Sequence, residues 1–450
     1  MAVQSYSIEI TAINLYKFGI LKSGIPAVPD KLNSLNIYPQ VQEVTIFESI
    51  FEPMIKCEIA VIDYIGLFVN FPLSGNEIVS IEWKNVGDDQ TQSWIFAIDD
   101  ANSISTDSKN RAVGFILKCV SIEALANNIG TVQQAYKGTS VQIAKQIYNE
   151  HIVNRVKSFF PSYRDRNVFA EDNETLTSTI VIPNMYPVAA IDMVQKFAIS
   201  EVSDKYTYLF YQNARGFNFR TLQGLSSGTA ARRYAKNNGY KYLSNEISDR
   251  DSKLNNEERL VSNLSFNRRH SAMQKLATGY FNNNLFEINI AQKAIHSTRT
   301  KTDDVKMMYK NKFDTDAFVE YAGYLIEGDE ISNRVKYTIT TRPESDTDFP
   351  VYRSRQRWGK DLISKIALSQ VDITAVIPGT NRFAAGDLFY LEIPEFHGFN
   401  EIKEDDLVTG YFIITEIKHI ITMGGYQTTV LRLNKDSYAS DINRASRYVT

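Results

Sequence analysis

Alternation of apolar and polar positions is clearest in residues 43–83, where it predicts three consecutive β-strands. In residues 55–64 every second side chain is apolar, and the apolar positions are Ile55, Cys57, Ile59 and Val61. A period of two residues is typical of a strand with one buried face. The flanking runs 44–50 and 77–83 are similarly rich in Ile, Val and Phe, and proline and glycine separate the runs. We expect an antiparallel meander that begins a barrel or curled sheet and carries no catalytic site.

The remainder of the first 122 residues continues the β pattern. Residues 1–22 predict a strand with Tyr6, Ile8, Ile10 and Ala12 on one face, and residues 92–99 and 112–122 predict two more strands. The Ser-, Asp- and Asn-rich stretch 99–110 between them predicts a long surface hairpin loop. Residues 1–122 are therefore expected to form an all-β domain of six or seven strands.

The period changes to that of a helix after residue 123. Apolar residues recur at helical spacing in residues 140–156 and 187–200, and Thr139 or Ser140 is a suitable N-cap for the first of these helices. Residues 157–186 show no regular pattern and are expected to be irregular. A mixed α/β region thus follows the first β domain.

A β-hairpin is predicted at residues 206–220, with Gly216 in a turn that favours positive φ. The polar stretch 221–265 predicts extended loops or an arm that contacts a partner. Strands are expected in 276–295 and 335–341, the charged stretch 297–315 is expected to be exposed, and residues 353–370 look helical towards their end.

The last part of the chain is again β-rich. Strands are predicted at residues 371–377, 388–393, 411–422 and 426–433, and Gly424-Gly425 marks a hairpin between the last two. The predicted fold class is α+β, mainly β, with two antiparallel barrel or curled-sheet domains on either side of a mixed α/β middle region. The expected divisions are 1–122, 123–365, 366–436 and a tail at 437–450. The hairpin near 206–220 could belong to the second β domain instead of the middle region.

Charge and composition narrow the function. The formal net charge is −3, so an electrostatic hold on nucleic acid or on an anionic membrane is disfavoured. No apolar run approaches the roughly 18 residues of a membrane span, and the N-terminus does not resemble a signal peptide. The two cysteines, Cys57 and Cys119, lie in alternating apolar runs and are expected to be buried thiols. These features predict a soluble protein made in a reducing compartment.

Residues with chemical potential are scattered and form no recognisable site. The five histidines lack the partners that catalysis or metal binding requires; they are His151, His270, His296, His397 and His419. Gly224–Thr229 is the nearest approach to a phosphate-binding loop, but it lacks the lysine. The carboxylate pairs Asp99-Asp100 and Asp303-Asp304 and the run Glu404–Asp406 lie in polar stretches that predict solvated turns. We therefore expect no catalytic, cofactor-binding or metal-binding residues, no cofactor, and no enzyme activity.

Three basic clusters were considered as contacts to nucleic acid. They are Arg232-Arg233, Arg268–His270 and Arg353–Lys360. None belongs to a sustained basic stripe interleaved with aromatic residues, and acidic residues outnumber basic ones overall. Salt-bridged surfaces or contacts to an acidic partner are the better interpretation.

The segment 48–77 resembles the first tube-like domain of the central baseplate hub proteins of contractile-tailed bacteriophages. The matching positions are Glu48, Ser49, Ile50, Phe51, Pro53, Asp63, Leu67, Phe71, Pro72, Leu73, Gly75 and Glu77. Residues 203–219 are similar to the middle hairpin of that family, and residues 276–280 to one of its strands. Residues 385–394 and 410–419 resemble its second tube-like domain.

The resemblance implies a structural role without catalysis. In such a hub, three subunits place six similar β domains in a ring around a channel. This ring connects the hexameric tail tube to the trimeric central spike. The implied partners are two further copies of the chain, the spike protein, the tail tube or tube-initiator protein, and baseplate wedge proteins. DNA would pass through the channel without specific binding. The implied location is the baseplate of the virion, after assembly in the host cytoplasm, and residues 43–83 and 385–433 would superimpose as the same curled sheet.

Other functions remain open on the sequence. A spike-base protein of a related contractile injection or secretion system is the main alternative, because it would use the same hub fold. A cell-wall hydrolase and a nucleic-acid-binding module are weaker alternatives, since no catalytic constellation and no basic aromatic face is evident.

Overall fold

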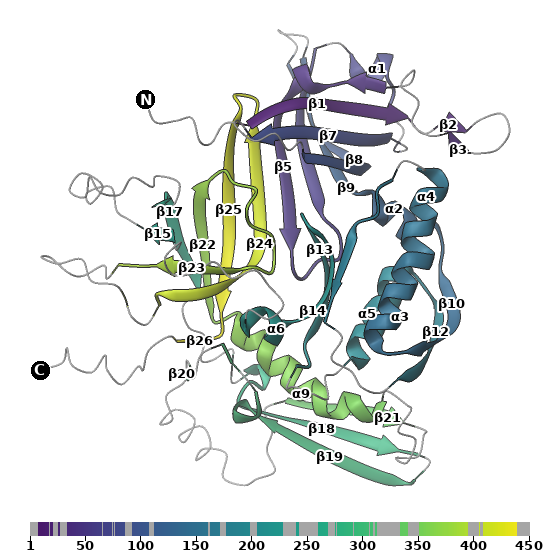
Figure 1. The fold of residues 1–450 in the computed structure, drawn as a ribbon, viewed down its shortest axis with the longest axis vertical. Helices are drawn as coiled ribbons and strands as arrows, with labels where there is room; N and C mark the ends of the chain where they lie inside the picture. The colour runs from purple at the N-terminus through teal and green to yellow at the C-terminus, as the bar shows by residue number, and fades with distance from the viewer. Residues whose placement is uncertain are drawn as a thin grey trace, which may run out of the picture.

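A computed structural model describes most of the 450 residues. The described residues are 8–17, 19–20, 26–27, 34–64, 66–73, 75, 77–85, 92–107, 112–160, 163–171, 177–198, 205–227, 240–242, 260–268, 275, 277–290, 292–305, 307–308, 311–312, 334–340, 351–394, 405 and 408–438. Among them, strands predominate, and the helices α2–α5, within residues 122–197, gather on one side of the molecule (Figure 1). The prediction of a mainly β, α+β protein is confirmed.

One sheet of 14 strands dominates the structure and contains strands from both ends of the chain. Its first β half is β1 (Ile8–Lys17), β4 (Ser34–Asn36), β5 (Val41–Ser49), β6 (Lys56–Asp63), β7 (Glu77–Asn85), β8 (Gln92–Asp107) and β9 (Ala112–Ser121). Its second β half is β15 (Tyr240–Tyr242), β16 (Leu260–Val261), β17 (Asn263–Arg268), β22 (Val371–Pro378), β23 (Leu388–Glu392), β24 (Gly410–Thr422) and β25 (Tyr426–Lys435). The halves join where β5 pairs antiparallel with β24, so that Ile46 lies opposite His419.

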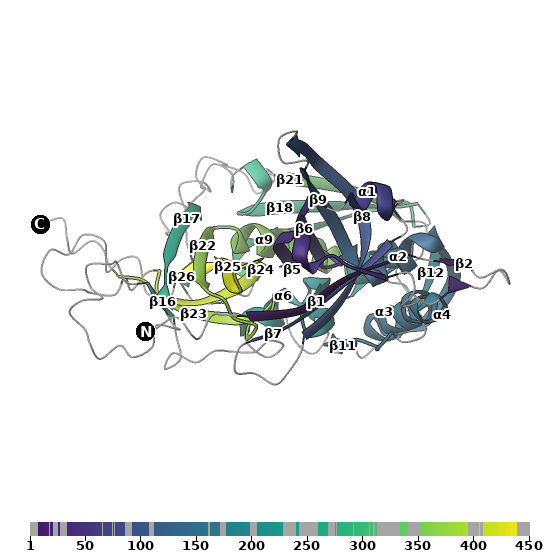
Figure 2. The same cartoon turned by 90° about the horizontal axis from the view of Figure 1, so that it is seen from above.

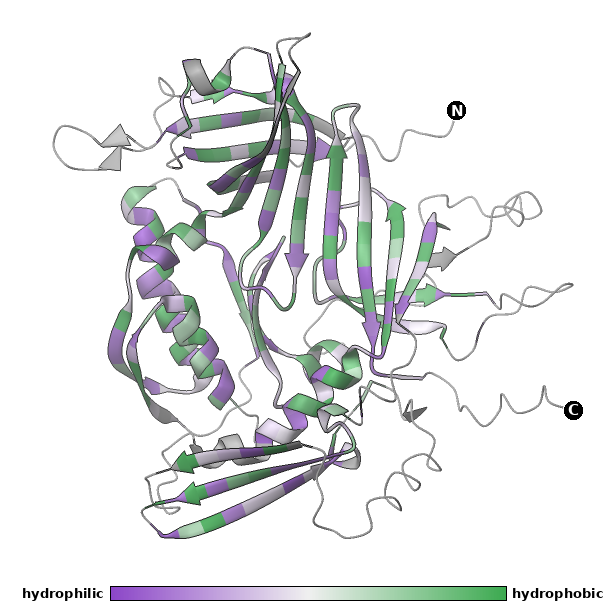
Figure 3. Ribbon diagram, turned by 180° about the vertical axis from the view of Figure 1, so that it is seen from behind, coloured by the Kyte–Doolittle hydropathy of each residue, from purple (hydrophilic) through white to green (hydrophobic). Residues whose placement is uncertain are grey.

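The predicted alternation decides which side chains of the first β half enter the core. On β6, Cys57, Ile59 and Val61 are buried together with apolar residues of β5 and β9. The intervening residues, among them Lys56 and Glu58, face the other side of the sheet. Figure 3 shows this alternation as bands of hydrophobic and hydrophilic colour along the strands. A second core lies beneath β22–β25 and buries the same kind of aliphatic and aromatic side chains.

The helices of the middle region cover the outer side of β7 and β8. They are α2 (Ile122–Ile129), α3 (Ser140–Tyr148), a π-helical turn (Asn149–Val153), α4 (Asn154–Phe159) and α5 (Pro187–Phe197). Ile78 and Ala97 belong to the same apolar cluster as these helices, whereas Val79 and Ile81 belong to the core of the sheet. Strand β7 is therefore buried on both faces. Figure 2 shows the helices grouped beside the sheet.

Two strands and a hairpin complete the middle region. β10 (Val132–Gly138) pairs with β12 (Ser178–Met185), and the predicted hairpin is β13 (Tyr208–Asn213) with β14 (Gly216–Thr221). β11 (Asn167–Ala170) runs parallel to β14, and Gly216 has φ +140°, as the predicted turn requires. A Cβ atom at Gly216 would lie 2.3 Å from the carbonyl oxygen of Asn167, so the β11–β14 contact needs glycine there. A short helix, α6 (Leu222–Ser227), follows the hairpin.

A separate three-stranded sheet lies at the end of the molecule opposite α1 (Leu67–Asn70) (Figure 1). It consists of β18 (Asn282–Asn289), β19 (Ala294–Lys301) and β21 (Arg334–Thr340), with α9 (Val351–Leu368) packed against β18 and β19. The remaining short elements are β2 (Gly19–Ile20), β3 (Pro26–Ala27), β20 (Asn311–Lys312), β26 (Ser437–Tyr438) and 3-10 turns at Tyr38–Gln40 and Thr302–Asp304.

Several expectations about single elements were wrong. Residues 99–107 continue strand β8 and are not part of a loop, because they pair with β9. Residues 157–186 hold the end of a helix and two strands. The stretch 297–315 was expected to be exposed, but in its described part Thr300 and Thr302 are buried. A β-bulge after Ile10 changes the face of β1, so Ile13 and Leu15, rather than Ala12, follow Ile10 into the core.

The helical expectations were closer to the structure. α5 matches the predicted second helix, and α9 is helical along its whole length rather than only at its end. Much of the polar stretch 221–265 lies outside the described residues, and the described parts include α6, β15, β16 and the beginning of β17. The tail after Tyr438 also lies outside the described residues.

The N-cap of α3 gives the first test. Thr139 Oγ1 accepts a hydrogen bond from Gln142 N at 3.2 Å, and Gln142 Oε1 accepts one from Thr139 N at 3.1 Å. We expect Thr139→Ala to lower the free energy of unfolding by about 1 kcal/mol, because one end of this capping box is lost. Thr139→Ser keeps the hydroxyl and is the matched control in urea denaturation. Equal stability of the two variants would contradict a role for the cap.

Candidate functional site: the polar trough and the junction beneath it

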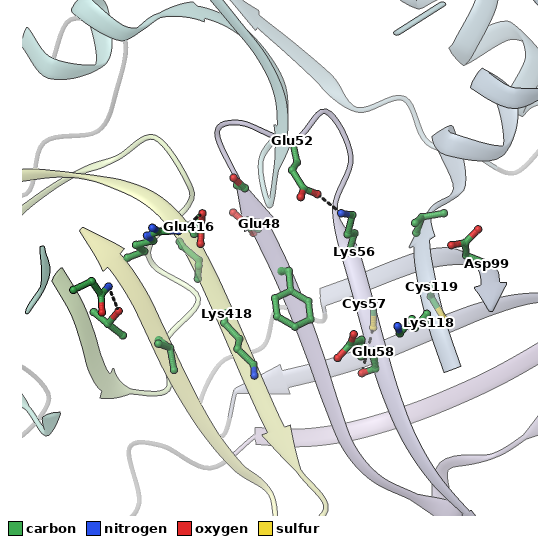
Figure 4. Close-up of a pocket in the computed structure, with 18 residues that line it drawn as sticks. Glu48, Glu52, Lys56, Cys57, Glu58, Asp99, Lys118, Cys119, Glu416 and Lys418 are labelled. Atoms are coloured by element: carbon green, nitrogen blue, oxygen red, sulfur yellow. Dashed lines mark hydrogen bonds and ion pairs between the residues drawn. The ribbon is translucent and has the colours of Figure 1, made fainter. Parts of the chain in front are cut away.

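The side of the large sheet that faces away from the core is a trough lined by charged and polar side chains. It runs across β17, β22, β25, β24, β5, β6 and β9 and encloses a volume of about 740 Å³. Residues of these strands line it, among them Glu58, Lys118 and Lys418 (Figure 4). Phe47 and Arg432 line it as well. We call this surface the polar trough. It spans the junction between the two β halves.

Cations and carboxylates of the polar trough are paired with one another. Lys56 Nζ lies 2.6 Å from Glu52 Oε2, as Figure 4 shows. The guanidinium of Arg432 contacts Asp372 at 2.7 Å and Glu416 at 2.9 Å. The Lys56–Glu52 and Arg432–Glu416 pairs are largely solvent-exposed, so each contributes little to stability, whereas Asp372 is buried. Their main consequence is electrostatic, because opposite charges side by side leave little net field at the surface.

Two further lysines in the polar trough lie near groups that attract their positive charge. Lys118 on β9 lies directly opposite Glu58 on β6 in the antiparallel register. The Nζ atom of Lys418 lies 5.4 Å from the centre of the Phe47 ring, across the β5–β24 junction. A cation above an aromatic ring is attracted by the negative face of the ring. The polar trough is therefore polar without being strongly basic.

A buried carboxylate holds the two β halves together beneath the polar trough. Glu48 on β5 is only 2% exposed, and its oxygens accept hydrogen bonds from Ala214 N at 3.0 Å and Ala385 N at 3.1 Å. Ala214 is at the tip of the β13–β14 hairpin, and Ala385 precedes β23. One side chain thus joins the first β half, the middle hairpin and the second β half. Burial raises the pKa of Glu48 to about 7.

The hairpin tip makes further polar contacts on both sides of Glu48. Arg215 binds Asp387 through two hydrogen bonds of 2.7 and 2.6 Å, and Asn213 Nδ2 donates to the carbonyl of Ala385 at 2.9 Å. Gln212 Oε1 accepts a hydrogen bond from Ile55 N at 3.1 Å in the first β half. The two-pronged geometry of Arg215 is the strong form of an ion pair. We call this set, with Glu48, the polar junction.

An apolar cluster surrounds the polar junction. It brings together Ile50 of the first β half, Leu209 and Tyr211 of the hairpin, and Leu388 and Ile413 of the second β half. Gly386 has φ +95°, and a Cβ there would lie 2.3 Å from the hydroxyl oxygen of Tyr211. Apolar packing and polar contacts therefore fix the same three segments.

The acidic residues in the predicted turn after β6 also have structural roles. Asp63 is buried and accepts a hydrogen bond from Leu67 N at the start of α1. Glu77 is buried and accepts one from Gly75 N at 2.9 Å, and Gly75 has φ +84°. These contacts satisfy backbone N–H groups that would otherwise be unpaired. They explain physically why this turn carries Asp, Gly and Glu at these positions.

The described histidines occupy separate places in the structure. His151 is partly buried, with Nε2 2.9 Å from the Tyr136 hydroxyl. Burial lowers its pKa from the usual range. His419 is buried, and burial lowers its pKa to about 4, so it is neutral at physiological pH. His296 lies on β19, and His270 and His397 lie outside the described residues.

The remaining candidate residues are also dispersed. Asp99 and Asp100 lie on strand β8 rather than in a loop, Asp303 and Asp304 lie in a 3-10 turn, and Glu404 and Asp406 lie outside the described residues. Gly224 is in α6, where a Cβ would overlap the Glu171 carboxylate, while Gly228 and Thr229 are outside the described residues. Cys57 and Cys119 are buried opposite each other as thiols, as expected.

The basic runs show a different pattern from the one expected. Arg357 is buried and donates to the carbonyls of Tyr206, at 2.6 Å, and Gln195, so it is a structural residue rather than a contact to nucleic acid. Arg268 ends β17, whereas Arg232-Arg233, Arg269 and His270 lie outside the described residues. Within the described residues, no group of three or more His, Cys, Asp or Glu side chains could hold a metal ion. No described helix is both long and apolar enough to span a membrane.

Sequence reasoning did not single out Arg215 and Asp387. Each stands next to a glycine in a predicted turn, Gly216 and Gly386, and a charged residue there is usually solvated. Glu48 had a clearer signal, because Ile46 and Ile50, two positions away on the same face of the predicted strand, are apolar. Only the three-dimensional structure brings these residues together.

Comparison with solved structures identifies proteins of similar fold. A tail protein from Neisseria meningitidis MC58 aligns over 96% of this chain and 97% of its own, with a TM-score of 0.52 and 11% identity. The 43 kDa tail protein of prophage MuSo2 from Shewanella oneidensis aligns over 95% of this chain and 99% of its own, with a TM-score of 0.51 and 10% identity. No protein-family model matches the sequence, and no curated protein matches it significantly. The chain has the fold of these tail proteins, so the resemblance found in the sequence is confirmed at the level of fold.

The polar junction predicts a defined dependence of stability on pH. The pKa of Glu48 is about 7 in the folded protein and near 4.5 when exposed, so the folded state holds the proton more tightly. Its contribution to stability is complete below pH 4.5 and is lost as the pH rises through 7. The difference in unfolding free energy between wild type and Glu48→Gln should fall by about 3 kcal/mol from pH 4 to pH 8. Urea denaturation at several pH values measures this difference.

A control separates this effect from the general titration of the protein. Glu58→Gln changes an exposed-face residue of the polar trough and leaves the polar junction intact. Its stability difference from wild type should change much less with pH than that of Glu48→Gln. A constant difference between wild type and Glu48→Gln across this pH range would show that Glu48 is not the titrating group.

Proposed function

We propose that the protein is a structural, non-enzymatic subunit of the baseplate hub of a contractile phage tail. The polar trough, a continuous concave surface formed by both β halves, is the observation that carries this proposal. The fold shared with two tail proteins supports it. The proposed location is the virion baseplate, with assembly in the host cytoplasm.

In this proposal, three copies form a ring and six β domains surround its channel. The chain divides as 1–122, 123–365 and 366–436, followed by a tail at 437–450. Uncovered strand edges support ring formation. Among the described residues, no strand pairs with the outer edge of β17, and beyond Ala97 strand β8 pairs with β9 alone. Exposed edges of this kind favour pairing with another chain, and pairing between unlike edges closes a ring when the rotation permits. The number three rests on the family resemblance.

The polar trough is proposed as the wall of the DNA channel. DNA binding gains its affinity from release of counterions when Lys and Arg contact phosphates. In the polar trough, Arg432 is engaged by Asp372 and Glu416, and Lys56 is engaged by Glu52. Such a wall would let DNA slide without holding it. The other proposed partners are the central spike protein, the tail tube or tube-initiator protein, and baseplate wedge proteins.

A spike-base protein of a related contractile injection or secretion system is the alternative. It would use the same ring but would not need a channel that releases DNA. The balanced charge of the polar trough favours the phage hub, because a pore for protein cargo has no need to avoid phosphate binding.

The proposed ring predicts the mass of the purified protein. Each chain has a mass of 51.2 kDa, and we expect native mass spectrometry or light scattering to give a trimer. Ser265→Pro, in the outer strand β17, should shift the mass towards the monomer, because proline removes a strand hydrogen-bond donor. Thr298→Pro in β19 is the control, since this strand lies outside the large sheet. A stable wild-type monomer that also fails to bind a spike or tube protein would refute the hub.

The ion pairs of the polar trough predict that the wild-type protein binds DNA weakly and that removing the carboxylates strengthens this binding. We expect no measurable binding of duplex DNA by wild type at about 0.15 M salt, because few counterions are released. The double variant Asp372→Asn, Glu416→Gln removes both partners of Arg432 and should bind DNA with an affinity that falls as salt rises. Fluorescence anisotropy measures both. A matched variant elsewhere, Asp192→Asn, Asp165→Asn, removes two exposed carboxylates outside the polar trough and should not acquire this binding.

A further inference from the structure

The sheet formed by β19, β18 and β21 has one face that the described chain leaves uncovered. In the register of these strands, Phe286 lies beside Tyr337, and Ile288 lies between Ile295 and Ile339. The Phe286 and Tyr337 rings stack with their centres 5.4 Å apart. Ile295 and Tyr337 are each 69% exposed and Ile339 is 65% exposed. We call this surface, together with Val335, the apolar face.

The opposite face of the same sheet is already packed. Helix α9 crosses β18 and β19, and Asn283, Glu287 and Thr300 are buried on that side. At Gly359 a Cβ atom would lie 2.2 Å from Thr300 and 2.4 Å from Asn283, so helix and sheet are in close contact. A sheet normally buries its apolar side against another layer of secondary structure. Here the helix covers the more polar side, and the apolar side has no described layer.

The size of the apolar face limits what can cover it. Two strands of eight residues and one of seven span about 14 Å by 26 Å, which is about 400 Å². A stable interface between two proteins usually buries about 800 Å² on each partner, so this face is too small to hold a dimer by itself. An α-helix is about 10 Å wide and rises 1.5 Å per residue, so one helix of roughly 18 residues would cover the face. α9, with 18 residues, spans the other side of the sheet.

The charges around the apolar face indicate the chemistry of that helix. Arg299 and Lys301 lie on the same side of β19 as Ile295, and Lys293 lies in the turn before it. The only carboxylate of the three strands, Glu287, is buried on the side of α9. Cations therefore border an apolar centre, and a partner with acidic flanks would meet them favourably.

We infer that the apolar face binds one amphipathic helix of a partner protein, with an aliphatic stripe against the sheet and acidic residues on its flanks. Recognition of a helix through its i, i+3, i+4 and i+7 side chains is a common mode of protein association. The inference does not depend on the proposed hub function, because it rests on this sheet alone.

Two peptides of the same length as α9 test the inference with the full chain. Both have leucine at helical i, i+3, i+4 and i+7 positions; one carries glutamate at the flanking positions, and the other carries lysine. We expect the glutamate peptide to bind at least about tenfold more tightly than the lysine peptide at low salt. Fluorescence anisotropy of labelled peptides measures both affinities. Equal affinities would overturn the inference.

Paired variants locate the binding surface. Ile339→Asp should weaken binding of the glutamate peptide at least about tenfold, because it places a carboxylate in the apolar centre. Val181→Asp is the control: Val181 is 62% exposed on β12, outside this sheet. Circular dichroism checks that both variants are folded, and Tyr337→Ser replaces Ile339→Asp if the latter is not. If both variants lose the same amount of affinity for the glutamate peptide, the peptide does not bind at the apolar face and the inference is overturned.

Two further measurements test other occupants. If a second copy covers the apolar face, sedimentation velocity will show an association that Ile339→Asp abolishes and Val181→Asp does not. If the chain itself covers the face, hydroxyl radicals will oxidise Tyr337 as slowly as the buried Tyr280. Either result would overturn binding of a partner helix. We expect rapid oxidation of Tyr337 and its protection by the glutamate peptide.

Discussion

The buried carboxylate of Glu48 is the constraint on which the large sheet depends. It accepts hydrogen bonds from Ala214 and Ala385, which are distant from it and from each other in the sequence. Burial of a carboxylate is unfavourable unless its oxygens are satisfied, so this arrangement is stable only when all three segments are in place. Glu48 thus joins the same two β halves that the pairing of β5 with β24 joins in one sheet.

The continuous sheet has one apolar face and one polar face. On β5, β6 and β24, residues that point inward join aliphatic cores, and those that point outward line the polar trough. β7 differs because helices cover its outer side, and its alternation therefore leads into two apolar clusters instead of one. The same period of two residues thus has different consequences, which depend on what packs against the strand.

Local pattern predicted the elements better than it predicted their pairing. The burial of Cys57, Ile59 and Val61 and the turn at Gly216 follow from periodicity and from backbone conformation. Residues 99–107 were expected to be a loop because they are polar, yet their pairing with β9 makes them a strand. The β-bulge in β1 moves the following residues to the opposite face of the strand, and no glycine or proline in the sequence indicates it.

The polar junction and the polar trough were harder to predict because their residues are far apart in the sequence. Arg215 and Asp387 are separated by 172 positions, and neither has a local partner that would reveal the contact. Similarly, Arg432 looks like an unremarkable strand cation until β22 and β24 bring Asp372 and Glu416 beside it. The positive features of the surface needed the register of paired strands.

The two uncovered sheet faces of the described protein have opposite chemistry, and that contrast bears on how the chain interacts. In the polar trough, cations lie beside carboxylates, so a large polyanion meets little net attraction. On the apolar face, aliphatic and aromatic side chains are exposed, and Arg299 and Lys301 of β19 lie at its border. Exposed apolar surface of this kind is disfavoured in water and is stabilised when another molecule covers it. The first surface therefore offers little attraction to a polyanion, and the second is stabilised by a contact that covers it.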